Sequence, residues 1–156
     1  MKRKVLEWSN QGDEFHITVV FIIVSLDDIA YFSQFNASEI NYYLNLYSNN
    51  IEHIEDIVNM LGINKDLFRV TYYDYEFLPL PVADKINILK EFIKSMNNRK
   101  YSDYFSTVTD DDLWIEFDKK FPDCMEKRDW NDFYKKRKTE IAEIWCKENG
   151  IRFNLK

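Results

Sequence analysis

Hydrophobic and polar residues follow strand-like patterns in the first half of the chain. An almost unbroken apolar run over residues 17–24 predicts a strand that is covered on both faces. Alternating patterns predict further strands over residues 40–47, 51–54 and 69–78. Ser48-Asn49-Asn50 separates the second strand from the third, and asparagine tolerates the positive φ of a tight turn. These two strands are therefore expected to form a hairpin.

Elsewhere, apolar residues recur every three or four positions, which predicts helices. Two short helices are expected early, one over residues 25–32 capped by Ser25 and one over residues 54–61 ended by Gly62. Four more are expected over residues 82–96, 101–105, 110–121 and 123–149. Apolar residues at positions 151, 153 and 155 then predict a docked or strand-like tail.

This order of elements predicts an α+β fold, in which a small, mainly antiparallel sheet packs against a C-terminal helical half. The 156 residues, 46% of them hydrophobic, can build one core without disulfides or metals. A single domain is expected, with a strand-rich half over residues 25–78 and a helical half over residues 79–156. Residues 1–24 are expected to form an N-terminal extension or an extra strand.

Charge, glycine content and cysteine spacing exclude several functional classes. The net charge of −6 opposes the basic surface of a general nucleic-acid binder. The three glycines form no phosphate-binding loop, so nucleotide-dependent catalysis is disfavoured and no cofactor is expected. Cys124 and Cys146 lack metal-ligand spacing and favour free thiols in a reducing cytoplasm. The apolar run over residues 17–24 is too short to span a membrane, so no membrane partner is expected.

Tyrosines concentrate on two of the predicted strands, and alternation would place some of them on an outer sheet face. Exposed tyrosines with a polar rim suit contact with a protein, but a layer of helices could equally cover that face. Consecutive acids at residues 110–112 add a negative surface, which capping of the following helix also explains. The candidate partner-binding residues are Tyr43, Tyr47, Tyr73, Tyr75, Asp110 and Asp111. They predict a non-catalytic interaction or regulatory protein that binds a protein partner.

A basic segment over residues 127–138 supports a nucleic-acid-binding alternative. It carries six Lys or Arg against two Asp, and Trp130 and Tyr134 could stack on bases beside a phosphate backbone. The competing interpretation is that these rings face the core while the cations are solvated. The candidate residues of this alternative are Lys127, Arg128, Lys135, Lys136, Arg137 and Lys138.

A metal-assisted hydrolase is a third hypothesis. Asp74 and Glu76 are two residues apart on a predicted strand and would share one face, and His53 could join them as a metal ligand or base. The sequence indicates neither a nucleophile nor a metal-ligand spacing beside them. No catalytic, metal-binding or cofactor-binding residue is therefore assigned.

Several stretches occur in the order and spacing of a known family. They are SLDDIA at residues 25–30, NYYLNLYSNNI at 41–51, FLPLP at 77–81, KEFIKSM at 90–96, LWIEFDKKFPD at 113–123 and IWCKENGI at 144–151. With the pair Trp130 and Phe133, they resemble a bacterial family known as uncharacterised protein family 0158. The family usually has a threonine-glycine turn where this chain has Ser48-Asn49-Asn50, and a glycine where it has Asp111. The resemblance implies a bacterial protein and, since the family has no assigned reaction, no catalytic residue.

Overall fold

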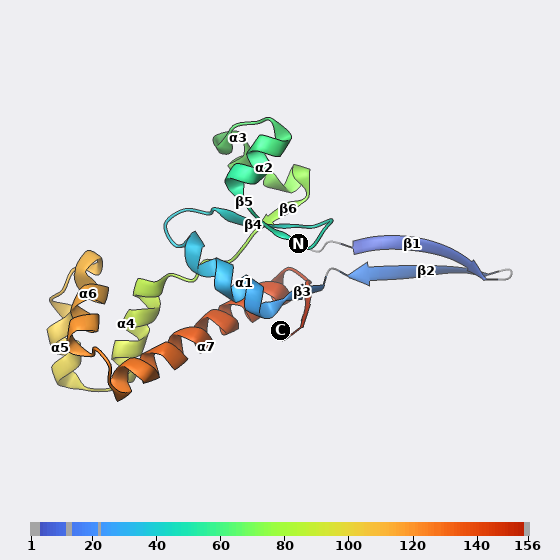
Figure 1. Cartoon of the computed structure of the whole chain (residues 1–156). Helices are drawn as coiled ribbons and strands as arrows, with labels where there is room; N and C mark the ends of the chain where they lie inside the picture. Colours follow the sequence, from blue (N-terminus) through green and yellow to red (C-terminus); the bar gives the residue numbers. More distant parts are fainter. Residues whose placement is uncertain (1–3, 12–13, 22, 155–156) are drawn as a thin grey trace.

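The computed structural model describes residues 4–11, 14–21 and 23–154 and has an α+β fold (Figure 1). Its helices are concentrated in the C-terminal half, and its largest sheet is antiparallel and has three strands. The predicted fold class is therefore confirmed. The predicted division into one domain with two halves stays a prediction.

The first strands differ from the predicted strand over residues 17–24. β1 (Lys4–Gln11) and β2 (Glu14–Phe21) form an antiparallel hairpin, while β3 (Ile23–Ser25) pairs in parallel with β7 (Arg152–Asn154). The expectation that both faces are covered is wrong at Ile23, which is 50% exposed, whereas the neighbouring Val24 is buried. Within the described part of the chain, β3 pairs with β7 alone, so no larger sheet encloses it.

The central sheet has the strand order β5-β4-β6 and is antiparallel throughout. It consists of β4 (Tyr42–Asn45), β5 (Ile51–His53) and β6 (Phe77–Pro79). The predicted hairpin of β4 and β5 is confirmed, and Asn49 in its turn has a φ of 67°. The left-handed backbone that this turn requires is one that asparagine adopts more readily than most residues.

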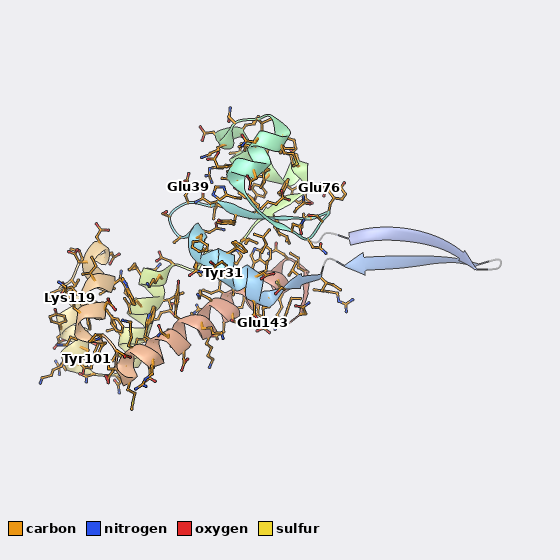
Figure 2. The ribbon with its side chains drawn as sticks, viewed as in Figure 1. Tyr31, Glu39, Glu76, Tyr101, Lys119 and Glu143 are labelled. Atoms are coloured by element: carbon orange, nitrogen blue, oxygen red, sulfur yellow. The ribbon has the colours of Figure 1, made fainter. Side chains whose placement is uncertain are left out.

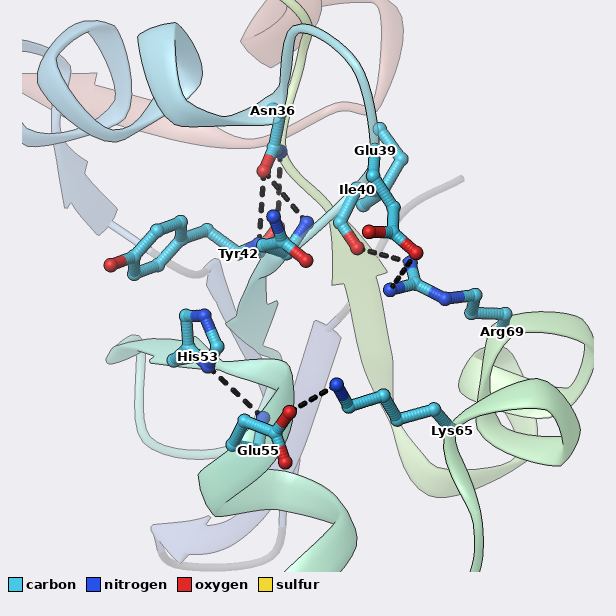
Figure 3. Close-up of polar contacts among 9 residues, drawn as sticks. Asn36, Glu39, Ile40, Tyr42, His53, Glu55, Lys65 and Arg69 are labelled. Atoms are coloured by element: carbon cyan, nitrogen blue, oxygen red, sulfur yellow. Dashed lines mark hydrogen bonds and ion pairs between the residues drawn. The ribbon is translucent and has the colours of Figure 1, made fainter.

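The predicted strand over residues 69–78 is wrong for most of its length. This segment forms the end of α3 (Lys65–Thr71), the 3₁₀ helix η2 (Tyr72–Tyr75) and only then β6. Asn64 starts α3, since its side chain accepts a hydrogen bond from the Leu67 amide at 2.8 Å. Arg69 ties α3 to the chain before β4 by pairing with Glu39 at 2.9 Å (Figure 3).

The two predicted early helices are confirmed as α1 (Leu26–Ser33) and α2 (Ile54–Leu61). The Ser25 hydroxyl accepts a hydrogen bond from the Asp28 amide at 3.4 Å, as expected of an N-cap. Gly62 ends α2 with a φ of 69°, a conformation that glycine adopts without steric cost. A short 3₁₀ helix, η1 (Gln34–Asn36), continues directly from α1.

The helical half contains α4 (Lys85–Ser95), α5 (Arg99–Ser106), α6 (Asp110–Lys120) and α7 (Met125–Glu148). The first of these begins later than predicted because Asp84 is its N-cap. The Asp84 carboxylate accepts hydrogen bonds from the Ile86 amide at 2.9 Å and the Asn87 amide at 3.4 Å. The long α7 packs against both α1 and α4 (Figure 1).

The buried residues form three clusters of different composition. Among the residues whose burial the structure describes, the aliphatic cluster contains no buried ring and consists of Val24, Leu26, Ile29, Ala30, Leu44, Leu46, Leu78, Leu80, Ala142, Cys146 and Ile151. The aromatic cluster lies between α4, α5, α6 and α7 and consists of Ala83, Ile88, Leu89, Phe92, Ile93, Phe105, Leu113, Phe117, Phe121 and Trp130. A third, smaller cluster packs α2 and α3 against the sheet. Residues of α7 belong to both large clusters, so this helix connects them.

Candidate functional site on the aromatic face of α1

Five rings gather on the outer side of α1, η1 and the β4–β5 hairpin, and we call this set the aromatic face. Its members are Tyr31, Phe32, Phe35, Tyr42 and His53. Ring centroids lie 5.4 Å apart for Tyr31 and Phe35, and 4.9 Å apart for Phe32 and Tyr42. Tyr31 is 53% exposed and Phe35 is 45% exposed. Tyr31 on α1 (Figure 2) and Phe35 in η1 therefore present large rings to solvent.

The helical period of α1 accounts for these outward rings. Leu26, Ile29, Ala30 and Ser33 are its buried residues, and they follow the spacing of one helical stripe. Small and aliphatic side chains fill the space beneath α1, so Tyr31 lies on the opposite side. Phe35 follows four residues later in η1 and contacts the same ring.

A buried amide fixes Tyr42 beside α1 (Figure 3). The Asn36 Oδ1 accepts hydrogen bonds from the backbone amides of Asn41 and Tyr42 at 3.0 and 2.9 Å. Its Nδ2 donates to the backbone carbonyls of Tyr42 and Leu80, both at 3.2 Å. Every polar atom of this side chain is engaged, and the single residue connects η1 to β4 and to the chain after β6. Four hydrogen bonds therefore hold the backbone beside the aromatic face in place.

Two open grooves flank α1. One, of about 500 Å³, runs between α1 and α7 and has Asp27, Asp28 and Tyr31 on one wall. Its other wall carries Lys135 and Lys138, so it combines both signs of charge around a ring. The second groove, of about 600 Å³, lies between α1 and the β4–β5 hairpin and is lined in part by Phe32, Ile51 and Met60. Apolar side chains of a partner could enter either groove beside the aromatic face.

The predicted tyrosine surface is not assembled as expected. Tyr43 is only 2% exposed and its ring lies 4.9 Å from that of Phe68, so its assignment to a surface contact is wrong. Burial raises the pKa of its hydroxyl above the usual 10.0, although the nearby Arg69 opposes this shift. Tyr47, Tyr73 and Tyr75 are exposed, but the last two lie in η2 and share no strand face with Tyr47.

The predicted acids lie elsewhere. Asp110 and Asp111 occupy the first turn of α6, where the positive end of the helix stabilises carboxylates, as expected. Asp110 also pairs with Lys90 at 2.7 Å. Figure 1 shows α6 at the far end of the molecule from the central sheet, so these acids and the exposed tyrosines do not form one surface.

The basic segment over residues 127–138 lies within α7 and is partly neutralised. Lys127 forms an ion pair with Asp118, and the Arg137 Nε lies 3.1 Å from a carboxylate oxygen of Glu91. Trp130 is 1% exposed, so it cannot stack on a base without leaving the core. Arg128, Lys135 and Lys136 are exposed. The nucleic-acid alternative therefore retains cations but loses one of its two rings.

The residues of the hydrolase hypothesis are not placed as predicted. The His53 Nδ1 accepts a hydrogen bond from the Glu55 amide at 3.1 Å and so serves as the N-cap of α2. Asp74 lies in η2, and Glu76 has a φ of 65°, so the two do not share a strand face. Within residues 4–11, 14–21 and 23–154, no group of three or more His, Cys, Asp or Glu is arranged to hold a metal.

The sequence analysis missed Tyr31 and Phe35, although a signal for them was present. The stripe formed by Leu26, Ile29, Ala30 and Ser33 identifies the buried side of α1, so Tyr31 has to lie outside it. Tyr31 and Phe35 lie outside the predicted strands on which the other tyrosines concentrate.

Comparisons of the chain with protein-family models, with curated proteins and with solved structures found no match. The resemblance to uncharacterised protein family 0158 therefore rests on the quoted stretches alone. Among the described residues, no helix has the length and apolar character needed to cross a membrane.

Proposed function

We propose that this chain is a non-catalytic interaction module that binds a protein partner on the aromatic face of α1. The observation that carries the proposal is the pair of half-exposed rings, Tyr31 and Phe35, which contact each other beside the less exposed Phe32 and Tyr42. Large exposed rings favour association because they bury much apolar area and lose little side-chain entropy. The support from Asn36 further reduces the ordering that binding requires.

The surroundings of the face suggest the chemistry of the partner. Asp27 and Asp28 lie at one end of the groove beside Tyr31, and Lys135 and Lys138 lie across from them. An apolar centre with a charged rim of both signs is the usual composition of a protein-protein contact. We therefore expect a partner segment with apolar side chains at its centre and polar groups at its margins.

A reducing compartment such as the bacterial cytoplasm suits this proposal, because Cys124 and Cys146 are both free thiols. A regulatory role would follow if occupancy of the face changed the activity of the partner. In this proposal the chain itself performs no bond-making step.

Site-specific photo-crosslinking tests the proposal with a matched control. A photoreactive phenylalanine analogue replaces Tyr31 in one variant. It replaces Tyr73 in a second variant, which is the control because Tyr73 is 51% exposed on a different surface. A protein crosslinked through position 31 is then purified, and its affinity is measured for wild type, for Y31A/F35A and for Y73A. We expect the double variant to lose about 30-fold or more in affinity and Y73A to lose less than about twofold.

Two results would contradict the proposal. In the first, Y73A weakens binding as much as the double variant, which would place the contact elsewhere. In the second, the double variant is folded by circular dichroism and binds the purified partner as tightly as wild type. Either result would remove the aromatic face from the contact.

A further inference from the structure

Three lysines converge on two rings where α4, α6 and α7 meet, and we call this set the lysine-ring cluster. It consists of Lys85, Lys127 and Lys138 with the rings of Trp114 and Tyr134. The Lys85 Nζ lies 3.5 Å from the centre of the Trp114 ring, and the Lys127 Nζ lies 5.0 Å from the same centre. The Lys138 Nζ lies 4.1 Å from the centre of the Tyr134 ring. Each ammonium group is therefore held in place by a ring.

These positive charges are close enough to repel one another. Because both lie over one ring, the nitrogens of Lys85 and Lys127 are separated by no more than 8.5 Å. Burial lowers the pKa of Lys85 most, Asp118 opposes that shift, and Lys127 and Lys138 lower the pKa further. Burial also lowers the pKa of Lys138. The cluster therefore holds its positive charges at an electrostatic cost.

Several carboxylates lie near the cluster: one pairs with a cluster lysine, and Asp27 and Asp28 line the same groove as Lys138. Asp118 pairs with Lys127, and Asp84 accepts hydrogen bonds from the first amides of α4. Among the described residues, neither Lys85 nor Lys138 forms an ion pair with a carboxylate. In a chain with a net charge of −6, two partly desolvated ammonium groups without such a partner mark a local site for an anion.

We propose that the lysine-ring cluster binds a ligand that carries a chain of phosphate groups. Lysine suits this role because its ammonium group is a compact charge with three hydrogen-bond donors. Contact with a ring leaves some of those donors free, and it reduces the side-chain entropy lost on binding. Several ammonium groups in one cluster can contact more than one phosphate of the same ligand, whereas a single carboxylate offers one charge. The sequence alone pointed to Lys127 and Lys138, whereas Lys85 joins them only through the packing of α4 on α7.

Titration calorimetry with inorganic tripolyphosphate tests this site directly. We expect K85Q and K138Q each to weaken binding by about tenfold, because each removes a charge-assisted contact. K136Q is the matched control, since Lys136 is an exposed lysine on the same helix, and it should weaken binding less than about twofold. K85R, which keeps the charge, should restore most of the affinity lost in K85Q. Circular dichroism of each variant verifies that it is folded.

A second arm with an oligothymidylate distinguishes a free phosphate chain from a nucleic-acid backbone. If both probes depend on Lys85 and both lose affinity between about 50 and about 200 mM salt, the proposal is supported. The affinities of the two probes are then compared at the higher salt concentration. The probe with the higher affinity there identifies the source of the phosphates. If neither probe binds, or if K136Q weakens binding as much as K85Q, the proposal is overturned. Failure here is distinct from failure of the proposed protein contact, because Tyr31 and Phe35 are unchanged throughout.

Discussion

The two large core clusters place their rings in opposite positions. The rings of the aliphatic cluster that the structure describes, such as Phe32 and Tyr42, lie at its margin and connect to the exposed Tyr31. The aromatic cluster contains five buried rings, and its outer rings carry lysines. The aromatic content of the chain is thus used as surface around the first cluster and as core in the second.

This difference determines what each surface can bind. An open ring loses ordered water when an apolar group covers it, so the aromatic face suits an apolar contact that salt weakens little. A ring that already holds an ammonium group presents a positive charge instead, so binding there should fall as salt rises. The number of aromatic residues in the sequence therefore cannot distinguish an apolar contact surface from an anion site. The position of each ring is needed for that distinction.

The largest expected effect is the loss of the central ring of the aromatic cluster. Trp130 is fully buried between Phe92, Phe117 and the stacked Tyr134, with ring centroids 5.7, 6.0 and 5.0 Å away. W130A should lower the free energy of unfolding by about 3–5 kcal/mol, because the cavity cannot close around so many fixed rings. Urea unfolding followed by circular dichroism at the helix band measures this change.

W130F is the graded control and should recover more than half of the loss, because it restores a ring to the same space. A loss below about 1 kcal/mol in W130A would show that this cluster can repack. The aromatic cluster would then not differ from an aliphatic core in its ability to close a cavity.

The second effect concerns the support of the aromatic face. N36A removes four hydrogen bonds and leaves buried backbone groups of Tyr42 and Leu80 without that partner. We expect the free energy of unfolding to fall by about 2–4 kcal/mol. N59A changes an exposed asparagine of α2 and should stay within about 0.5 kcal/mol of wild type. Equal effects of N36A and N59A would mean that Asn36 does not support the face.

Much of the fold could be predicted because the signals are local. Ser25, Gly62 and the turn at Asn49 each act within a few residues, and all three lie where the sequence placed them. The predicted strand over residues 69–78 was wrong because alternating tyrosines and polar residues also fit a helix followed by a 3₁₀ turn. The decisive facts were the cap at Asn64 and the burial of Phe68, which tertiary packing determines.

The candidate sites depended on contacts between distant segments and so were harder to predict. Lys85 meets Trp114 and the lysines of α7 only because α4, α6 and α7 pack together. Tyr43 was assigned to a surface because the sequence does not show that Phe68 of α3 covers it. Periodicity identifies the buried side of an element, whereas the identity of the covering element depends on the whole fold.

The third expected effect is a pH-dependent loss of stability caused by the buried thiol of Cys146, which is then compared with the thiol of Cys124 at the other large cluster. Cys146 is fully buried in the aliphatic cluster, and burial, assisted by the charge of Glu143, raises its pKa from 9.0 to about 11. The unfolded thiol loses its proton near pH 9.0, whereas the folded thiol keeps its proton until about pH 11, so this contribution to stability disappears as pH rises between these values. Wild type should lose of the order of 2 kcal/mol more than C146A over this range.

Alkylation gives an independent measure of the same contrast. Cys124 is half-buried at the margin of the aromatic cluster, and it should react with iodoacetamide well before Cys146 does. Parallel pH curves for wild type and C146A, or equal alkylation rates for the two thiols, would contradict the assigned burial of Cys146.

The smallest expected effect is the coupling between the two exposed rings of the aromatic face. Tyr31 and Phe35 meet edge to face with centroids 5.4 Å apart, whereas Tyr73 makes no ring contact within the described part of the chain. A double-mutant cycle of Y31A and F35A should give a coupling energy of about 0.5–1 kcal/mol, while the cycle of Y73A and Y75A should give about zero. Thermal unfolding of the seven required proteins, with wild type shared by the two cycles, measures both values. Because both rings are half exposed, coupling of this size would show that they support one another before any partner arrives, as a preformed contact surface requires. A coupling as weak as that of Tyr73 and Tyr75 would instead describe rings that move independently, and the entropy of ordering them would then weaken the proposed contact.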